Sequence, residues 1–186
     1  MEEDSIITRI AVPADVKYVY QILDAMEAGA KERGTGIARR PVQYLCRKIY
    51  EGKAVISVSK ESEWVGFSYL ESWSNDGFVS NSGLIVHPKF RGAGIASGIK
   101  KMIFDLSKKL YPKANIFSIT TGAAVLKLNF DLGFQPVTYS DITKDEKFWD
   151  QCKSCANYSI LESKNRKMCL CTAMISYQAA PLKTSF

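Results

Sequence analysis

The sequence lacks the features that mark membrane, secreted and histidine-dependent proteins. No uninterrupted apolar run approaches the length of a membrane span, and the acidic start Met1-Glu2-Glu3-Asp4-Ser5 lacks the basic residues and apolar core of a signal peptide. The one histidine, His87, stands beside a proline at the end of an apolar segment and is not expected to be catalytic. We therefore expect a soluble cytoplasmic protein without a membrane partner.

An even number of cysteines and a concentrated basic patch are also missing. The chain has an odd number of cysteines, five, which favours reduced thiols or a metal site over disulfides. Its net charge of +6, from 25 basic and 19 acidic residues, lacks the interleaved aromatic residues of a nucleic-acid surface, so no nucleic-acid partner is expected. Lysines gather on and after one expected helix, where they predict a solvated face or attraction of a polyanionic ligand: Lys100, Lys101, Lys108, Lys109 and Lys113.

Two phosphate-binding motifs are absent as well. No Gly-Lys pair followed by Ser or Thr forms a Walker loop, and a dinucleotide fingerprint fails because its third glycine would fall on Ser97. The chain does contain a strand-like run at 84–86, a basic glycine turn and an amphipathic segment at 97–110. Such a turn exposes backbone N–H groups at a helix start, and Arg91 adds a fork of donors. This stretch therefore predicts a pyrophosphate site.

The turn fits one further pattern at every position, Arg91-Gly92-Ala93-Gly94-Ile95-Ala96. It resembles the acyl-CoA pyrophosphate loop of the GNAT superfamily of N-acyltransferases. Val86-His87-Pro88 before the loop, a strand-like run at 116–121 and a short helix closed by Gly133-Phe134 match that family in order and spacing. The resemblance covers roughly residues 5 to 140 and implies acetyl-CoA, or another acyl-CoA, as donor, bound by these six loop residues.

The resemblance also implies the fold and the domain organisation. The expected fold is α/β, with a mixed, mostly antiparallel central sheet splayed at the acyl-CoA site and helices on both faces. Residues 1–140 would form the acyl-CoA-binding core. Residues 141–186, which carry most of the cysteines, would add helix, loop and a final strand to the same domain.

By the same resemblance, the amine attacks the thioester directly. The backbone of Leu84, Ile85 and Val86 would bind the pantetheine arm and polarise the carbonyl group. The family often has a tyrosine as general acid four residues before Gly-Phe, but Asn129 stands here and cannot supply a proton as an acid. Tyr139 or a water is an alternative acid. The candidates for the base are Glu71 and Ser82 with a water.

The loop between the first two helices borders the acceptor site in such proteins. Arg39 and Arg40 lie there, and an arginine can bind a carboxylate with two hydrogen bonds. We therefore expect a small acceptor such as the amino acid glutamate, and the segment 34–41 resembles a GNAT subgroup that acylates amino acids in arginine biosynthesis. The alternatives are a protein lysine or N-terminal acetyltransferase and a non-catalytic acyl-CoA sensor. The chain would act as a monomer or homodimer.

The remaining candidate site consists of cysteines. Cys152 and Cys155 form a Cys-x-x-Cys pair, and Cys169 and Cys171 share one face of a strand expected over 167–177. Four thiolates suffice for a tetrahedral structural zinc site. Buried thiols, or a redox pair at Cys152 and Cys155, are the other interpretations.

Overall fold

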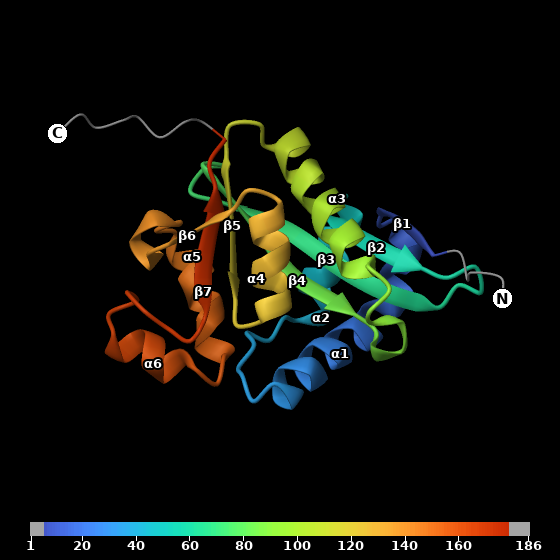
Figure 1. The fold of residues 1–186 in the computed structure, drawn as a ribbon, viewed down its shortest axis with the longest axis horizontal. Helices are drawn as coiled ribbons and strands as arrows, with labels where there is room; N and C mark the ends of the chain where they lie inside the picture. The colour runs from blue at the N-terminus through green and yellow to red at the C-terminus, as the bar shows by residue number, and fades with distance from the viewer. Residues whose placement is uncertain (1–5, 179–186) are drawn as a thin grey trace.

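The computed structural model describes residues 6–178. Their strands form one twisted seven-stranded sheet with the order β1-β2-β3-β4-β5-β7-β6 (Figure 1). Only β4 and β5 run parallel; every other neighbouring pair is antiparallel. The expected mixed, mostly antiparallel sheet is confirmed. The strands are β1 Ile7–Ile10, β2 Ala54–Val58, β3 Trp64–Trp73, β4 Phe78–Val86, β5 Asn115–Thr120, β6 Gln135–Val137 and β7 Thr172–Ser176.

Helices cover both faces of the sheet, as expected (Figure 1). None of those in residues 6–178 combines the length and apolar character that a membrane crossing needs. The helices are α1 Val19–Glu32, α2 Val42–Tyr50, α3 Ile95–Leu110, α4 Ala123–Asp131, α5 Glu146–Asp150 and α6 Tyr158–Ser163. Short 3-10 turns occupy Pro13–Tyr18, Pro88–Phe90, Tyr139–Asp141 and Gln151–Ser154.

Alternating side chains along the strands divide the core between the two faces. Ile56 of β2 and Tyr69 of β3 pack in the cluster that contains α1 and α2, whereas Val55 and Leu70 pack with α3. This is the period-two pattern of a sheet buried on both sides. We call the side covered by α1 and α2 the first face and the side covered by α3 and α4 the second face.

The strands β4 and β5 separate in the middle of the sheet. They pair only from Phe78–Asn115 to Ser80–Phe117, yet β4 continues to Val86. The register between β3 and β4 also shifts in this region, where Gly83 has φ +65°. An added Cβ on Gly83 would lie 2.6 Å from Cε1 of Tyr69, so both the backbone conformation and the packing require glycine. The sheet is therefore splayed where the sequence predicts the acyl-CoA site.

The C-terminal segment belongs to the same sheet, because β7 lies between β5 and β6. It also packs against the loop between α1 and α2. The backbone N–H of Arg39 donates to Oγ of Ser154 at 3.0 Å, and a Cβ added to Gly36 would lie 2.5 Å from Sγ of Cys155. Two segments more than a hundred residues apart thus meet on the first face.

Candidate active site

The glycine turn has the geometry of an anion cradle. Gly92 and Gly94 have φ values of +86° and +75°, and Gly94 is the N-cap of the 16-residue helix α3. Both glycines are exposed and have no heavy atom within 4 Å of an added Cβ, so a ligand can approach the backbone closely. Free N–H groups and the helix dipole make such a helix start attractive to phosphate.

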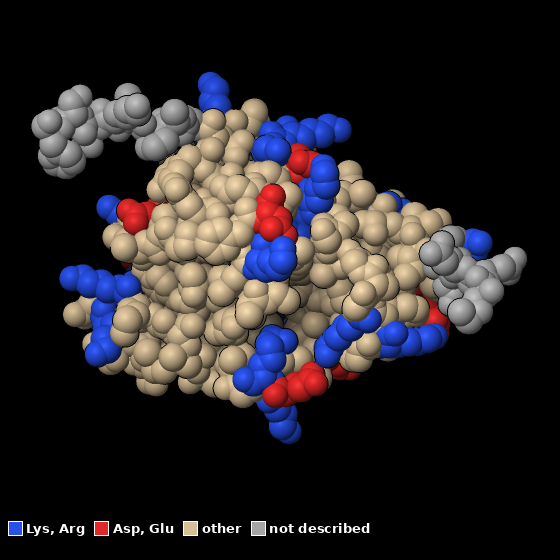
Figure 2. Space-filling view, in the orientation of Figure 1, with Lys and Arg blue, Asp and Glu red and all other residues tan. Residues whose placement is uncertain are grey.

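Basic side chains surround this cradle. Lysine and arginine gather over α3 and around the turn before it on the face shown in Figure 2. Arg91 itself is partly exposed; it donates to the carbonyl of Val86 at 3.4 Å and pairs with Glu32 at 3.4 Å. An exposed pair of this kind is weak, so Arg91 can exchange it for a phosphate.

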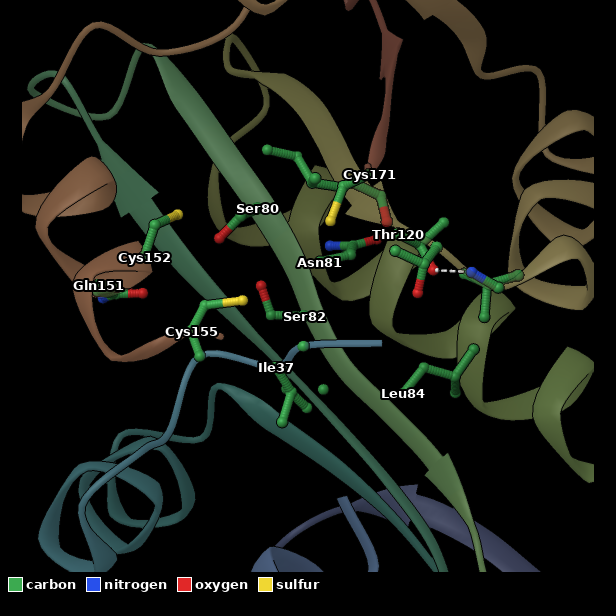
Figure 3. A pocket seen from close by; sticks show the side chains of 18 of the residues that line it. Ile37, Ser80, Asn81, Ser82, Leu84, Thr120, Gln151, Cys152, Cys155 and Cys171 are labelled. Atoms are coloured by element: carbon green, nitrogen blue, oxygen red, sulfur yellow. Dashed lines mark hydrogen bonds between the residues drawn. The ribbon is translucent and has the colours of Figure 1, made fainter. Parts of the chain in front are cut away.

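A cavity of about 410 Å³ opens where β4 and β5 separate (Figure 3). Its walls come from β4, from the start of α4, from the α1–α2 loop and from the C-terminal segment. Asn81, Ser82 and Thr120 all line the cavity (Figure 3). Asn81 donates to Ser107 of α3 on the second face, whereas Ser82 lies opposite Tyr69, which packs on the first face. The hydroxyl of Thr120 accepts a hydrogen bond from the N–H of Gly122 at 3.0 Å. The cavity therefore extends through the splay from one face of the sheet to the other.

The cavity wall is cationic. Among residues 6–178 it includes Arg33, Arg40 and Lys100 but no aspartate, glutamate or histidine. Its other polar groups are uncharged and come from serine, threonine, asparagine, glutamine, tyrosine and cysteine side chains. Such a wall favours an anionic ligand and disfavours a cationic one.

Arg40 is the half-buried charge on the first face. Its Nε donates to the hydroxyl of Tyr69 at 2.8 Å, and its Nη1 donates to the carbonyl of Ala38 at 3.2 Å. Among residues 6–178 it forms no ion pair. A guanidinium that stays charged and has no carboxylate partner is ready to receive one from a ligand. Arg39, the other arginine predicted to bind the acceptor, lies outside the cavity and pairs with Glu27 at 3.4 Å.

Two of the predicted catalytic residues line the cavity. Ser82 lies on β4 opposite Tyr69, and its carbonyl accepts from Oγ of Ser68 at 2.9 Å. The hydroxyl of Tyr139 donates to the carbonyl of Cys171 at 2.8 Å. Burial, followed by the nearby cysteines, raises the pKa of Tyr139 well above its usual value. With a pKa raised in this way, Tyr139 is a poor proton donor at neutral pH.

The other two predicted catalytic residues do not line the cavity. Glu71 pairs with the buried ammonium of Lys48 and accepts a hydrogen bond from Tyr44 at 3.1 Å. Asn129 is completely buried, and its amide lies 3.7 Å from the sulfur of Met174 while Oδ1 has no partner. Glu71 is therefore engaged by its own ion pair, and Asn129 is out of reach of a ligand in the cavity.

The four C-terminal cysteines all line the cavity on its first face. In residues 6–178, however, no group of three or more His, Cys, Asp and Glu side chains is arranged to hold a metal ion, so the structure does not support the predicted zinc site of Cys152, Cys155, Cys169 and Cys171. The expected strand is also shorter, because β7 begins at Thr172, after both members of the Cys-x-Cys pair. Burial raises the pKa of Cys152 to about 11 and that of Cys171 to about 12, so both are protonated thiols at neutral pH.

Sequence reasoning missed two cations and one wall of the cavity. Arg33 follows α1 and received no role, and Lys100 was expected on a solvated helix face, whereas the structure buries it at 2 % exposure. The helical spacing of Lys100 with the buried Ile103 and Ser107 would have placed it on the inner side of α3. The wall formed by 148–158 had no local signal, because it depends on how the C-terminal segment folds back.

The sequence matches no protein-family model, and it matches none of the curated proteins with which it was compared. The structure, by contrast, has the GNAT fold, in agreement with the resemblance seen in the sequence.

Three solved structures illustrate this similarity. N-acetylglutamate synthase from Neisseria gonorrhoeae, complexed with coenzyme A and N-acetyl-glutamate, has a TM-score of 0.66 and 14% identity over 96% of this chain, which spans only 36% of the synthase. A Mycobacterium tuberculosis protein in complex with CoA has a TM-score of 0.63 and 16% identity over 92% of this chain and 98% of its own. A GNAT phosphinothricin acetyltransferase from Sinorhizobium meliloti, in complex with acetyl-CoA, has a TM-score of 0.61 and 13% identity over 97% and 95% of the two chains. At these identities the likeness establishes the fold.

Proposed function

We propose that this protein is an N-acyltransferase that moves an acetyl or other short acyl group from acyl-CoA to the amine of a small acceptor carrying a carboxylate. The acceptor is an amino acid, with glutamate as the first candidate. The observation that carries the proposal is the cationic cavity, in which Arg40 has no carboxylate partner, at the splay of a GNAT fold.

The donor half of the proposal is supported by the turn before α3 and by the splay. The cradle at Gly92 and Gly94 suits a pyrophosphate, and the unpaired part of β4 leads from it to the cavity. Structures of similar fold hold coenzyme A or acetyl-CoA.

The acceptor half is supported by charge. A carboxylate can accept two hydrogen bonds from Arg40, whereas a lysine side chain would bring a fourth cation into a wall without an acidic group. An α-amine also ionises near pH 8 rather than near 10.4, so a larger fraction is ready to attack at neutral pH. These points favour an amino acid over a protein lysine.

The test is release of thiol from acetyl-CoA and succinyl-CoA in the presence of single amino acids, including glutamate and ornithine. Each active amino acid is compared with its methyl ester, which keeps the amine but removes the charge that Arg40 would bind. We expect the ester to lose activity through a higher KM. An ester as good as the acid would contradict carboxylate recognition, and donor binding without thiol release from any acceptor would favour the sensor.

A further inference from the structure

Lys100 is a buried cation without an anionic partner. Its side chain points from α3 into the second face, where Nζ donates to Oδ1 of Asn81 at 3.3 Å and lies 4.8 Å from the ring centre of Phe134. Asn81 in turn donates to Ser107 at 2.8 Å. An ammonium has three donors, and Asn81 is the one hydrogen-bond acceptor it finds among residues 6–178.

Lys48 is a second buried lysine, and its ion pairs give it a structural role. Lys48 is as deeply buried as Lys100, but it pairs with both Glu71 and Glu51. Lys100 forms no ion pair in the part of the chain that the structure describes, and it lines the cavity. A buried charge without a counter-charge is costly for folding, so packing does not explain Lys100.

The position of Lys100 relates it to the donor rather than to the acceptor. Asn81 directly follows Ser80, the last β4 residue that pairs with β5, so Nζ lies at the apex of the splay. The same helix begins at the glycine cradle on the second face. A donor held at that cradle and extended along β4 brings its thioester toward Lys100, while Arg40 faces the cavity from the first face.

We propose that Lys100 is the catalytic acid, which protonates the coenzyme A sulfur as the thioester breaks. This inference rests on the proposed acyl transfer. It gives a proton donor to a cavity whose lining, in the part of the chain that the structure describes, contains no carboxylate, no histidine and no contact with Asn129.

The acyl transfer begins with the acceptor as a neutral amine. Its nitrogen attacks the thioester carbon, the C–N bond forms and the carbonyl π pair moves to oxygen. When the carbonyl re-forms, the C–S bond breaks, its electron pair goes to sulfur, and sulfur takes a proton from Nζ of Lys100. The nitrogen of the new amide releases one proton to solvent, and neutral Lys100 takes one back.

The proton moves in the favourable direction because burial lowers the pKa of the Lys100 ammonium to about 7. A thiol has a pKa of about 8.5, whereas an ordinary lysine, with a pKa of about 10.4, would hold its proton more tightly than the thiolate. No charged group contributes to this shift. Asn81 faces the ammonium from β4, Ser107 lies on the same helix and Phe134 precedes β6. The other titratable groups of the cavity wall are Arg33, Arg40, Tyr69, Tyr139, Tyr158 and the four cysteines.

The first test compares Lys100→Met with Lys101→Met. Lys101 is the exposed neighbour, paired with Asp105 at 2.7 Å. We expect K100M to lower kcat about 100-fold, the lower range for general acid catalysis, with little change in KM, and K101M to behave as wild type. In the wild type, kcat/KM for acetyl-CoA should fall above pH 7 as Lys100 loses its proton, and K100M should lack this alkaline limb. A raised KM with an unchanged pH profile would overturn the proposal in favour of a binding role.

Asn81→Asp provides an independent test. It places a carboxylate beside Nζ, which raises the pKa of Lys100, so the alkaline limb should move to higher pH. If N81D folds and turns over but the limb stays in place, the group that titrates is not Lys100.

A third measurement does not depend on the acceptor. Free coenzyme A is titrated on the wild type and on K100M, and its thiolate is followed by ultraviolet absorbance against ligand-free protein. Below about pH 7, where Lys100 is an ammonium, the bound thiol should form more thiolate in the wild type than in K100M, and the two titrations should converge at higher pH, where Lys100 is neutral. If the bound thiol titrates equally in the wild type and in K100M, Lys100 is not the acid, whereas the proposed acyl transfer is not affected. Absence of coenzyme A binding by the wild type would instead overturn the proposed function and the inference with it.

Discussion

The two sides of the splayed sheet differ in how they are assembled. On the second face, the proposed donor side is a continuous run of chain: β4, the glycine turn and α3 follow one another directly. On the first face, the proposed acceptor side combines the loop after α1 with the segment 148–158 and with β4. A ligand site formed by adjacent residues can be recognised in the sequence as a motif. A site formed by distant segments contributes only single residues, which form no motif.

The comparison predicts that the two sides can be damaged separately, and the largest effect should come from the donor side. Gly92→Val puts a β-branched residue at φ +86° and a side chain where the pyrophosphate would approach. We expect about 100-fold weaker binding of coenzyme A by calorimetry, roughly 3 kcal/mol, with a circular dichroism spectrum like that of the wild type. Unchanged affinity would remove the turn from the donor site.

The acceptor side should respond to Arg40→Gln, with Arg39→Gln distinguishing the two arginines. Loss of a charged hydrogen-bonding group costs about 1.5 to 3 kcal/mol, so R40Q should raise the acceptor KM roughly 10- to 150-fold without changing coenzyme A affinity. R39Q loses only an exposed pair with Glu27, for which we expect less than about a threefold change. The reverse order of effects would assign the carboxylate to Arg39.

A charge buried on the donor side should also appear in the stability of the protein. Lys100 has a pKa of about 7 when folded and an ordinary lysine pKa of 10.5 when unfolded, so the unfolded state binds one more proton between these values. The wild type should therefore gain up to about 1.4 kcal/mol of stability per pH unit over this range relative to K100M, and none below pH 7. Denaturant unfolding of both proteins from pH 6 to 10 measures this difference. Parallel curves would mean that burial does not lower the pKa of Lys100.

The smallest effect should come from the contact between the distant segments of the acceptor side. Gly36→Ala adds a Cβ within 2.5 Å of Sγ of Cys155, which should shift the loop and raise the acceptor KM a few-fold. Cys155→Ala removes the sulfur and should restore the KM when combined with G36A. A double mutant no better than G36A would show that this contact does not position the loop.

The sequence was sufficient for the glycine turn on the second face, but not for the buried Lys100 there and not for the first face. The glycine turn, Val86-His87-Pro88 and the run at 116–121 indicated the fold and the donor loop through their resemblance to the GNAT superfamily, because each depends on local geometry. Arg40 was identified only together with Arg39, since adjacent residues in a loop give no indication of which one faces inward. Lys100 was misjudged because charge suggests exposure, while its neighbours on α3 are buried. Zinc was predicted from cysteine spacing, which does not specify how the thiols are placed in space.

The separation of β4 from β5 has a consequence for hydrogen exchange. Beyond Ser80, the edge of β4 that faces β5 has lost its neighbouring strand. An extended ligand with amide groups, lying in that gap, would act as a surrogate strand and close the sheet. The central amides of the sheet should then exchange slowly only when the donor is bound, so that ligand and protein share one cooperative unit of secondary structure.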